Sequence, residues 1–166
     1  MSTSVESPAA QDVVDFPRRV RLFGIQIDAI EMRQAVERIR DWIREPSATC
    51  RFVVTPNVDH IVMLQSHDAF RQTYQQADLV LADGWPVVWA SRKLGQPLPG
   101  LVPGSDLVPA LFGAASESFR NANGNRLRVF LLGAAPGVAA RAARRIENDW
   151  PGVDVVREYS PPLGFE

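Results

Sequence analysis

Asp83 and Gly84 follow a short apolar run, Leu79–Ala82. Such a run is typical of a buried strand, and the ligands of an open α/β sheet bind beyond the carboxyl ends of its strands. A carboxylate at that place can remove a proton or hold a ligand. Gly84 has no Cβ, so backbone or ligand can come close to it. The structural alternative is a turn in which Asp83 caps the next helix, and these residues alone leave both interpretations open.

Polar residues also end the strand predicted at residues 51–55. Thr55 and Asn57 supply a hydroxyl and an amide on either side of Pro56. Both groups suit the hydroxyls of a sugar, and the alternative is a turn followed by a helix cap. His60 lies near the start of the helix expected after Asn57, where we expect it to be packed rather than to act as a base.

A third polar group opens a predicted apolar helix at Gly104, Ser105 and Asp106. Ser105 is a natural N-cap, and Asp106 in the first turn is favoured by the helix dipole. The same three residues could instead bind a ligand, so their role also stays open on local grounds.

The connection Gly133–Gly137 follows the strand predicted at residues 127–132. Its glycines allow close backbone approach and a helix begins after it, so phosphate binding is expected about as much as a plain turn. The glycine spacing fits neither a dinucleotide fingerprint nor a P-loop, which disfavours a nicotinamide or ATP site. Because the carboxyl ends of parallel strands share one edge, this connection, Thr55–Asn57 and Asp83-Gly84 could line one cleft.

The elements that must position these residues alternate between strands and helices with short connections, which predicts an α/β fold with a largely parallel sheet and helices on both faces. The length of 166 residues suits one domain. Residues 1–18 read as a disordered leader, and residues 19–166 as the α/β domain. We expect strands at residues 19–28 (two short ones or one bulged one), 51–55, 79–82, 127–132 and 153–156, and helices starting near residues 32, 58, 68, 86, 105 and 138.

Composition excludes several classes of protein. The net charge of −1 gives no sign of a nucleic-acid binder. Cys50 is the single cysteine and there are two histidines, so an intrachain disulfide and a cysteine or zinc cluster are not expected. No apolar run approaches the roughly 20 residues of a transmembrane helix, and no signal peptide opens the chain. We therefore predict a cytoplasmic protein.

Four segments together are similar in order and spacing to the WecG/TagA/CpsF glycosyltransferase family. They are Thr55–Asp59, Ala77–Gly84, Gly104–Leu107 and Phe130–Gly137. The closing Tyr159–Pro162 also resembles that family, and the resemblance covers about residues 19–166.

The resemblance implies a Rossmann-like domain that transfers a hexosamine-type sugar, such as N-acetylmannosamine, from a UDP-sugar to a polyprenyl-diphosphate-linked acceptor, with inversion and without a metal. Such enzymes build bacterial cell-surface polysaccharides or exopolysaccharides. A location at the inner face of the membrane, a peripheral membrane contact and a homo-oligomer are compatible with this reading. By resemblance, Asp83 matches the catalytic base, Thr55 and Asn57 active-site residues, Gly133, Ala134, Pro136 and Gly137 the nucleotide-sugar loop, and Gly84, Gly104, Ser105 and Asp106 substrate-binding positions.

Two departures from the family pattern favour an alternative. Leu101 stands where the family often has an arginine, which would help to stabilise a diphosphate. Family members also usually continue beyond the position of Glu166 with a glycine-rich loop and a basic tail, so we expect the chain to be an N-terminal portion of such a protein. The alternative is a non-catalytic module that binds a nucleotide sugar and needs a partner or the missing part.

Overall fold

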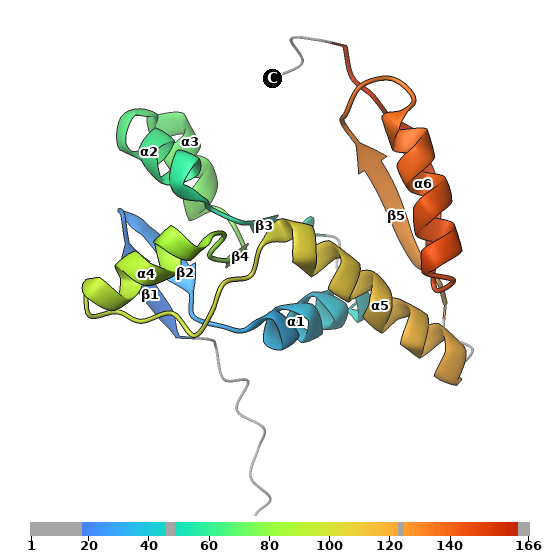
Figure 1. The fold of residues 1–166 in the computed structure, drawn as a ribbon, viewed down its shortest axis with the longest axis horizontal. Helices are drawn as coiled ribbons and strands as arrows, with labels where there is room; N and C mark the ends of the chain where they lie inside the picture. The colour runs from blue at the N-terminus through green and yellow to red at the C-terminus, as the bar shows by residue number, and fades with distance from the viewer. Residues whose placement is uncertain (1–17, 46–48, 123–124, 163–166) are drawn as a thin grey trace, which may run out of the picture.

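The computed structural model describes residues 18–45, 49–122 and 125–162 (Figure 1). Of the leader predicted at residues 1–18, all but Arg18 lies outside these ranges. The elements in chain order are β1 (Arg19–Leu22), β2 (Ile25–Asp28), α1 (Met32–Arg44), β3 (Val53–Val54), α2 (Val58–Ser66), α3 (Asp68–Gln75), β4 (Leu79–Val80), α4 (Trp85–Lys93), α5 (Gly104–Ala122), β5 (Leu127–Leu132), α6 (Val138–Asp149) and β6 (Val153–Tyr159). The predicted α/β class is confirmed.

The first two strands form an antiparallel hairpin, in which Leu22 pairs with Ile25 across a two-residue turn. Both turn residues, Phe23 and Gly24, have positive φ angles of 54° and 83°, the conformation that matches the twist of paired strands. The apolar side chains of the hairpin alternate toward one core, which is why two short strands form here. That core also receives the inner face of α4 and residues of α2 and α3.

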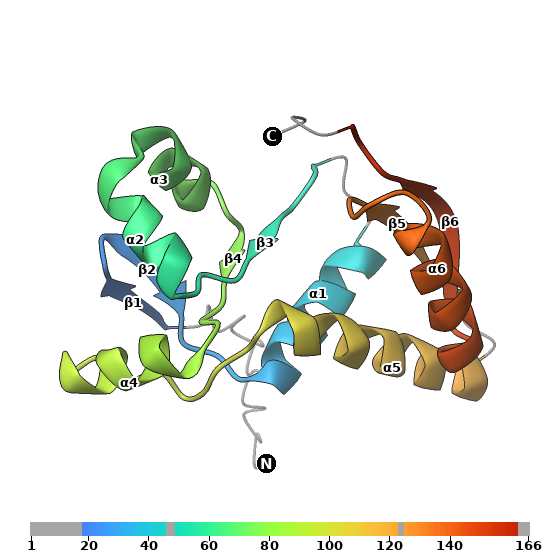
Figure 2. The same ribbon diagram turned by 45° about the horizontal axis from the view of Figure 1, so that its top comes forward.

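The parallel pair β3–β4 runs through the middle of the molecule (Figure 2). Val53 pairs with Leu79 and Val54 with Val80. Backbone hydrogen bonds continue the pairing beyond the strands, since the N–H of Leu81 donates to the Val54 carbonyl at 2.9 Å. Leu79, Val80, Leu81 and Ala82 are all buried, as the apolar run predicts.

A buried carboxylate joins the hairpin to this pair. Asp28, which is 3% exposed, accepts a hydrogen bond at Oδ2 from the N–H of Val80 at 2.8 Å. Its Oδ1 accepts from Nε of Arg19, also at 2.8 Å. The edge of β4 thus obtains from a side chain the partner that a third strand would provide.

The two long helices α1 and α5 pack against each other beneath the parallel pair, and a second apolar core lies between them and β4. A capping box starts α1, where the N–H of Glu31 donates to Oε1 of Gln34 at 2.9 Å. No helix within the described ranges combines the length and apolar character needed to cross a membrane.

The last three elements form a separate unit. β5 and β6 pair in parallel with each other, in a two-stranded sheet distinct from β3–β4. The unit sits on the far end of α5, where the N–H of Gly152 donates to Oγ of the buried Ser116 at 3.1 Å and the rings of Phe112 and Trp150 meet at 5.5 Å. Both views place it away from the carboxyl end of β4 (Figures 1 and 2). The expectation of one edge shared by all strand ends is therefore wrong for β5.

The Asp28 contact predicts a large effect of Asp28→Ala on stability. The variant should lower the free energy of unfolding by about 1–3 kcal/mol, because it leaves the buried N–H of Val80 without a partner. The control is Asp41→Ala, which removes an exposed ion pair with Arg44 and should cost less than about 1 kcal/mol. Urea unfolding of both variants measures the difference, and equal losses would contradict the assignment.

Candidate active site

The carboxyl ends of β3 and β4 bring the first predicted site residues together. The N–H of Asp83 donates to the Pro56 carbonyl at 3.0 Å. This bond sets the segment after β4 beside Thr55-Pro56-Asn57. The structure thus places Thr55, Asn57 and Asp83 at one edge, as expected for parallel strands.

Asp83 does not cap the helix that follows it. The N-cap of α4 is Gly84, whose φ of 91° favours glycine, and no side chain caps this helix. The carboxylate of Asp83 is half-buried and has no hydrogen bond or ion pair with any residue in the described ranges. Its oxygens are therefore available to a ligand, which is the geometry that a general base needs.

Asn57 does act as a cap, which was the structural alternative for this residue. Its Oδ1 accepts from the N–H of His60 at 3.0 Å and so starts α2. The cap fixes the side chain at the carboxyl end of β3 and uses only its oxygen. The amide NH₂ group donates to no residue in the described part of the chain and can still donate to a ligand.

The start of α5 forms the other wall of this edge. The N–H of Val102 donates to the Ala82 carbonyl at 2.8 Å, which holds the loop before the helix against the end of β4. Gly104 then passes so close to Thr55 that a Cβ on it would lie 3.2 Å from Oγ1 of Thr55. A side chain at position 104 would disturb this contact.

The prediction that Ser105 is the N-cap of α5 is wrong by two positions. The helix begins at Gly104, and the Pro103 carbonyl accepts from the N–H groups of Asp106 and Leu107 at 3.0 and 2.9 Å. The first bonds of the helix thus run to the Pro103 carbonyl, so the helix starts earlier than the serine pattern suggests. The N–H groups of Gly104 and Ser105 have no backbone partner in the described ranges, and Gly104 lies against Thr55.

Side chains in this first turn are polar and exposed. Oγ of Ser105 donates to Oδ1 of Asp106 at 3.4 Å. Leu101, just before the buried Val102, is 39% exposed and brings no charge to the edge. A hydroxyl, a carboxylate and two amide groups therefore stand at one helix start, without a cationic side chain at position 101.

The glycine-rich connection Gly133–Gly137 is not part of this edge. The N–H of Gly133 donates to the Tyr159 carbonyl at 2.9 Å, and Oγ of Ser160 donates to the Gly133 carbonyl at 3.4 Å. The loop is thus fastened to β6 in the unit at the far end of α5 (Figure 1). One of its amide groups is already used, and the structure does not bring Gly133, Ala134, Pro136 or Gly137 to Asp83.

His60 is a packed residue, as the sequence suggests. Its Nδ1 lies 2.6 Å from the hydroxyl of Tyr74, and its ring meets that of Phe70 edge-on at 5.4 Å. Burial raises the pKa of Tyr74 to about 12, so its hydroxyl stays protonated and can donate to Nδ1.

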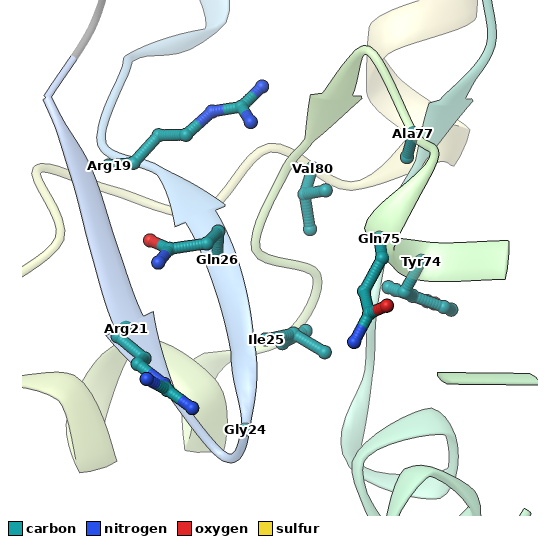
Figure 3. A pocket seen from close by; sticks show the side chains of 9 residues that line it. All are labelled: Arg19, Arg21, Gly24, Ile25, Gln26, Tyr74, Gln75, Ala77 and Val80. Carbon is teal, nitrogen blue, oxygen red and sulfur yellow. The ribbon is translucent and has the colours of Figure 1, made fainter. Parts of the chain in front are cut away.

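Two cavities at the opposite end of β4 were not predicted from the sequence. One of about 480 Å³ is lined by Arg19, Arg38, Arg51 and Asp78, among others. The other, of about 210 Å³, lies between the hairpin and α3, with Arg21, Gln26 and Gln75 around it (Figure 3). No predicted site residue lines either cavity, and Arg19 is bound to Asp28. No group of three or more potential metal ligands occurs within the described ranges.

Comparison with known proteins agrees with the resemblance. The model of the glycosyl transferase WecG/TagA/CpsF family matches residues 20–166, and the chain belongs to this family. It is also similar to curated proteins called N-acetylglucosaminyldiphosphoundecaprenol N-acetyl-beta-D-mannosaminyltransferase, from Staphylococcus aureus strains NCTC 8325 / PS 47, COL and MSSA476. Each is 30% identical over 141 residues, which cover 85% of this chain and 53% of the relative. The chain thus spans about half the length of the curated relatives it matches.

The contact between Gly104 and Thr55 predicts opposite effects of alanine at two glycines of α5. Gly113→Ala should raise the free energy of unfolding by up to about 1 kcal/mol, because alanine favours a helix and its Cβ meets nothing within 4 Å. Gly104→Ala should lower it by about 1 kcal/mol or more, since its Cβ presses on Thr55. Thermal melting of both variants tests this, and a stabilising Gly104→Ala would show that the approach is not tight.

Proposed function

We propose that the chain is the part of a glycosyltransferase that carries the catalytic base. The proposed reaction transfers a hexosamine-type sugar, such as N-acetylmannosamine, from a UDP-sugar to a polyprenyl-diphosphate-linked acceptor, with inversion at the anomeric carbon. Membership in the family supports the reaction class. The name of the Staphylococcus aureus relatives supports the choice of sugar and acceptor.

The observation that carries the proposal is the half-buried carboxylate of Asp83. It has no protein partner within the described ranges and stands beside Thr55, Asn57 and the start of α5. A carboxylate with a structural role at such a place would be paired, as Asp28 is, or would cap a helix, as the amide of Asn57 does. A base must instead keep its oxygens open to the substrate.

In the proposed step, Asp83 accepts the proton of an acceptor hydroxyl while that oxygen attacks the anomeric carbon of the donor sugar. The new carbon–oxygen bond forms as the bond between the sugar and UDP breaks, and UDP leaves with the electron pair. Thr55 and Asn57 would hold sugar hydroxyls through their own hydroxyl and amide groups. Gly84 would leave room for the sugar, because it has no side chain.

The start of α5 is proposed to bind the donor. The amide groups of Gly104 and Ser105 lack a backbone partner among the described residues, and the positive end of a helix stabilises the charge that develops on a departing diphosphate. The side chains of Ser105 and Asp106 would contact sugar hydroxyls rather than phosphate, since a carboxylate repels an anion. No metal is required in this scheme.

The setting follows from the proposed acceptor. An acceptor that is anchored in a lipid bilayer places the reaction at the membrane surface, and we propose the cytoplasmic face. The product would enter the assembly of a cell-surface polysaccharide or exopolysaccharide.

A second candidate function is the binding of a nucleotide sugar without transfer by this chain alone. Two observations favour it. The connection Gly133–Gly137, which the family resemblance assigns to the nucleotide, is fastened to β6 and away from Asp83. Leu101 also brings no positive charge to the site. Binding of UDP without turnover of any UDP-sugar would support this second candidate.

The variant Asp83→Asn tests the base directly. In the active protein it should keep the fold and the affinity for UDP, because the shape is preserved, while turnover falls by about 10²–10⁴. The matched control is Asp149→Asn, which removes one carboxylate charge from an exposed ion pair with Arg145 and should leave turnover unchanged. Calorimetry measures the affinity for UDP. The turnover rate is measured separately, from the UDP that the reaction releases. An Asn variant with near-native turnover would remove Asp83 from this role.

A further inference from the structure

The outer face of α4 carries two tryptophans that the fold leaves uncovered. Trp85 is 56% and Trp89 53% exposed, whereas Val87, Val88 and Ser91 on the inner face are at most 2% exposed. Helix geometry puts residues four positions apart on one side, so the two indoles form a single surface opposite the buried face. The helix lies at the edge of the molecule (Figure 2).

Cations lie against both rings. The guanidinium of Arg92 is 5.3 Å from the ring of Trp85, and Nζ of Lys93 is 5.8 Å from that of Trp89. Lys93 follows Trp89 by four positions and extends the same surface along the helix. No acidic residue occurs in α4, although the whole chain has a net charge of −1. The outer face of α4 is thus both aromatic and positive.

We propose that this face of α4 docks on the surface of an anionic lipid bilayer. Indole rings favour the boundary between headgroups and acyl chains, and lysine and arginine next to them are attracted to lipid phosphates. The nine residues of α4 are too short to span a bilayer, so the helix would lie in the interface. This inference rests on the proposed function in one respect: docking would hold the protein at the bilayer in which the proposed lipid-linked acceptor is anchored.

The position of α4 supports this occupant. The helix begins at Trp85, two residues after Asp83, so docking would set the proposed base next to the headgroup layer. A diphosphate anchored in the bilayer lies at that level.

The exposed apolar surface of α2 lacks the positive charge of α4. On α2, Val62 and Met63 are 64% and 41% exposed, yet the helix contains neither lysine nor arginine. This surface is the natural control, because it is apolar and exposed without carrying a positive charge.

Flotation with lipid vesicles tests the proposal on the whole chain. The vesicles contain phosphatidylglycerol mixed with phosphatidylcholine, or phosphatidylcholine alone, and hold neither acceptor lipid nor sugar nucleotide. The wild-type chain should float with the anionic vesicles, and its tryptophan emission should shift to shorter wavelength. Two double variants should each weaken the partition about tenfold or more. One combines Trp85→Ala with Trp89→Ala, and the other combines Arg92→Gln with Lys93→Gln. Val62→Ala with Met63→Ala should leave it unchanged, and circular dichroism should show every variant folded.

Three results would overturn the proposal. The first is a wild-type chain that does not float with anionic vesicles, or floats equally with neutral ones. The second is an equal loss in the α2 control and the α4 variants. The third is a dimer in sedimentation that depends on Trp85 and Trp89 without vesicle binding, which would assign the face to a second copy of the chain. Because the vesicles lack acceptor and donor, the flotation result does not depend on whether the chain transfers a sugar. A chain that fails to float leaves the role of Asp83 to be decided by the Asp83→Asn variant.

Discussion

The carboxylate of Asp28 is the interaction on which the arrangement of the central strands depends. A two-stranded sheet is marginally stable by itself, and β3–β4 is such a sheet. Asp28 binds the N–H of Val80 at the open edge of β4, and Arg19 neutralises the charge from the other side. Burying a carboxylate is costly unless its oxygens are hydrogen-bonded, and here both are. The direction of β4, and with it the position of Asp83 at its end, follows from this contact.

The site at that end differs chemically from the carboxylate that supports it. Asp28 has every oxygen occupied by protein groups, whereas Asp83 has none occupied within the described ranges. Gly84 starts the next helix in place of Asp83, and Gly104 lets α5 approach Thr55. These two glycines keep space and an unpaired acid at the same edge. An arrangement of this kind favours binding and proton transfer over stability. The Asp28 contact that supports β4 comes from the hairpin β1–β2.

Much of this could be predicted from sequence, because short-range signals determined it. The apolar run before Asp83 predicted a buried strand. The pattern around Gly24 predicted two short strands or one bulged strand, and the structure has the two strands. The start of α5 was misplaced because the first bonds of the helix run to the backbone carbonyl of Pro103 rather than to the side chain of Ser105. The prediction that Gly133 shares an edge with the ends of β3 and β4 was wrong for another reason. Alternation of strands and helices indicates parallel pairing but does not indicate which strands pair. The Asp28 contact joins residues 52 positions apart, and no local pattern reveals such a bond.

Amide hydrogen exchange with and without a saturating UDP-sugar tests the central claim, that the edge formed by β3, β4 and the start of α5 is the donor site. Slower exchange is expected at Gly104 and Ser105, whose N–H groups would bind the diphosphate, and in the segment from Thr55 to Asn57. Exchange at Gly113, further along the same helix, should not change. Protection confined to residues 132–139, with none at the start of α5, would contradict the account and assign the nucleotide to the connection after β5.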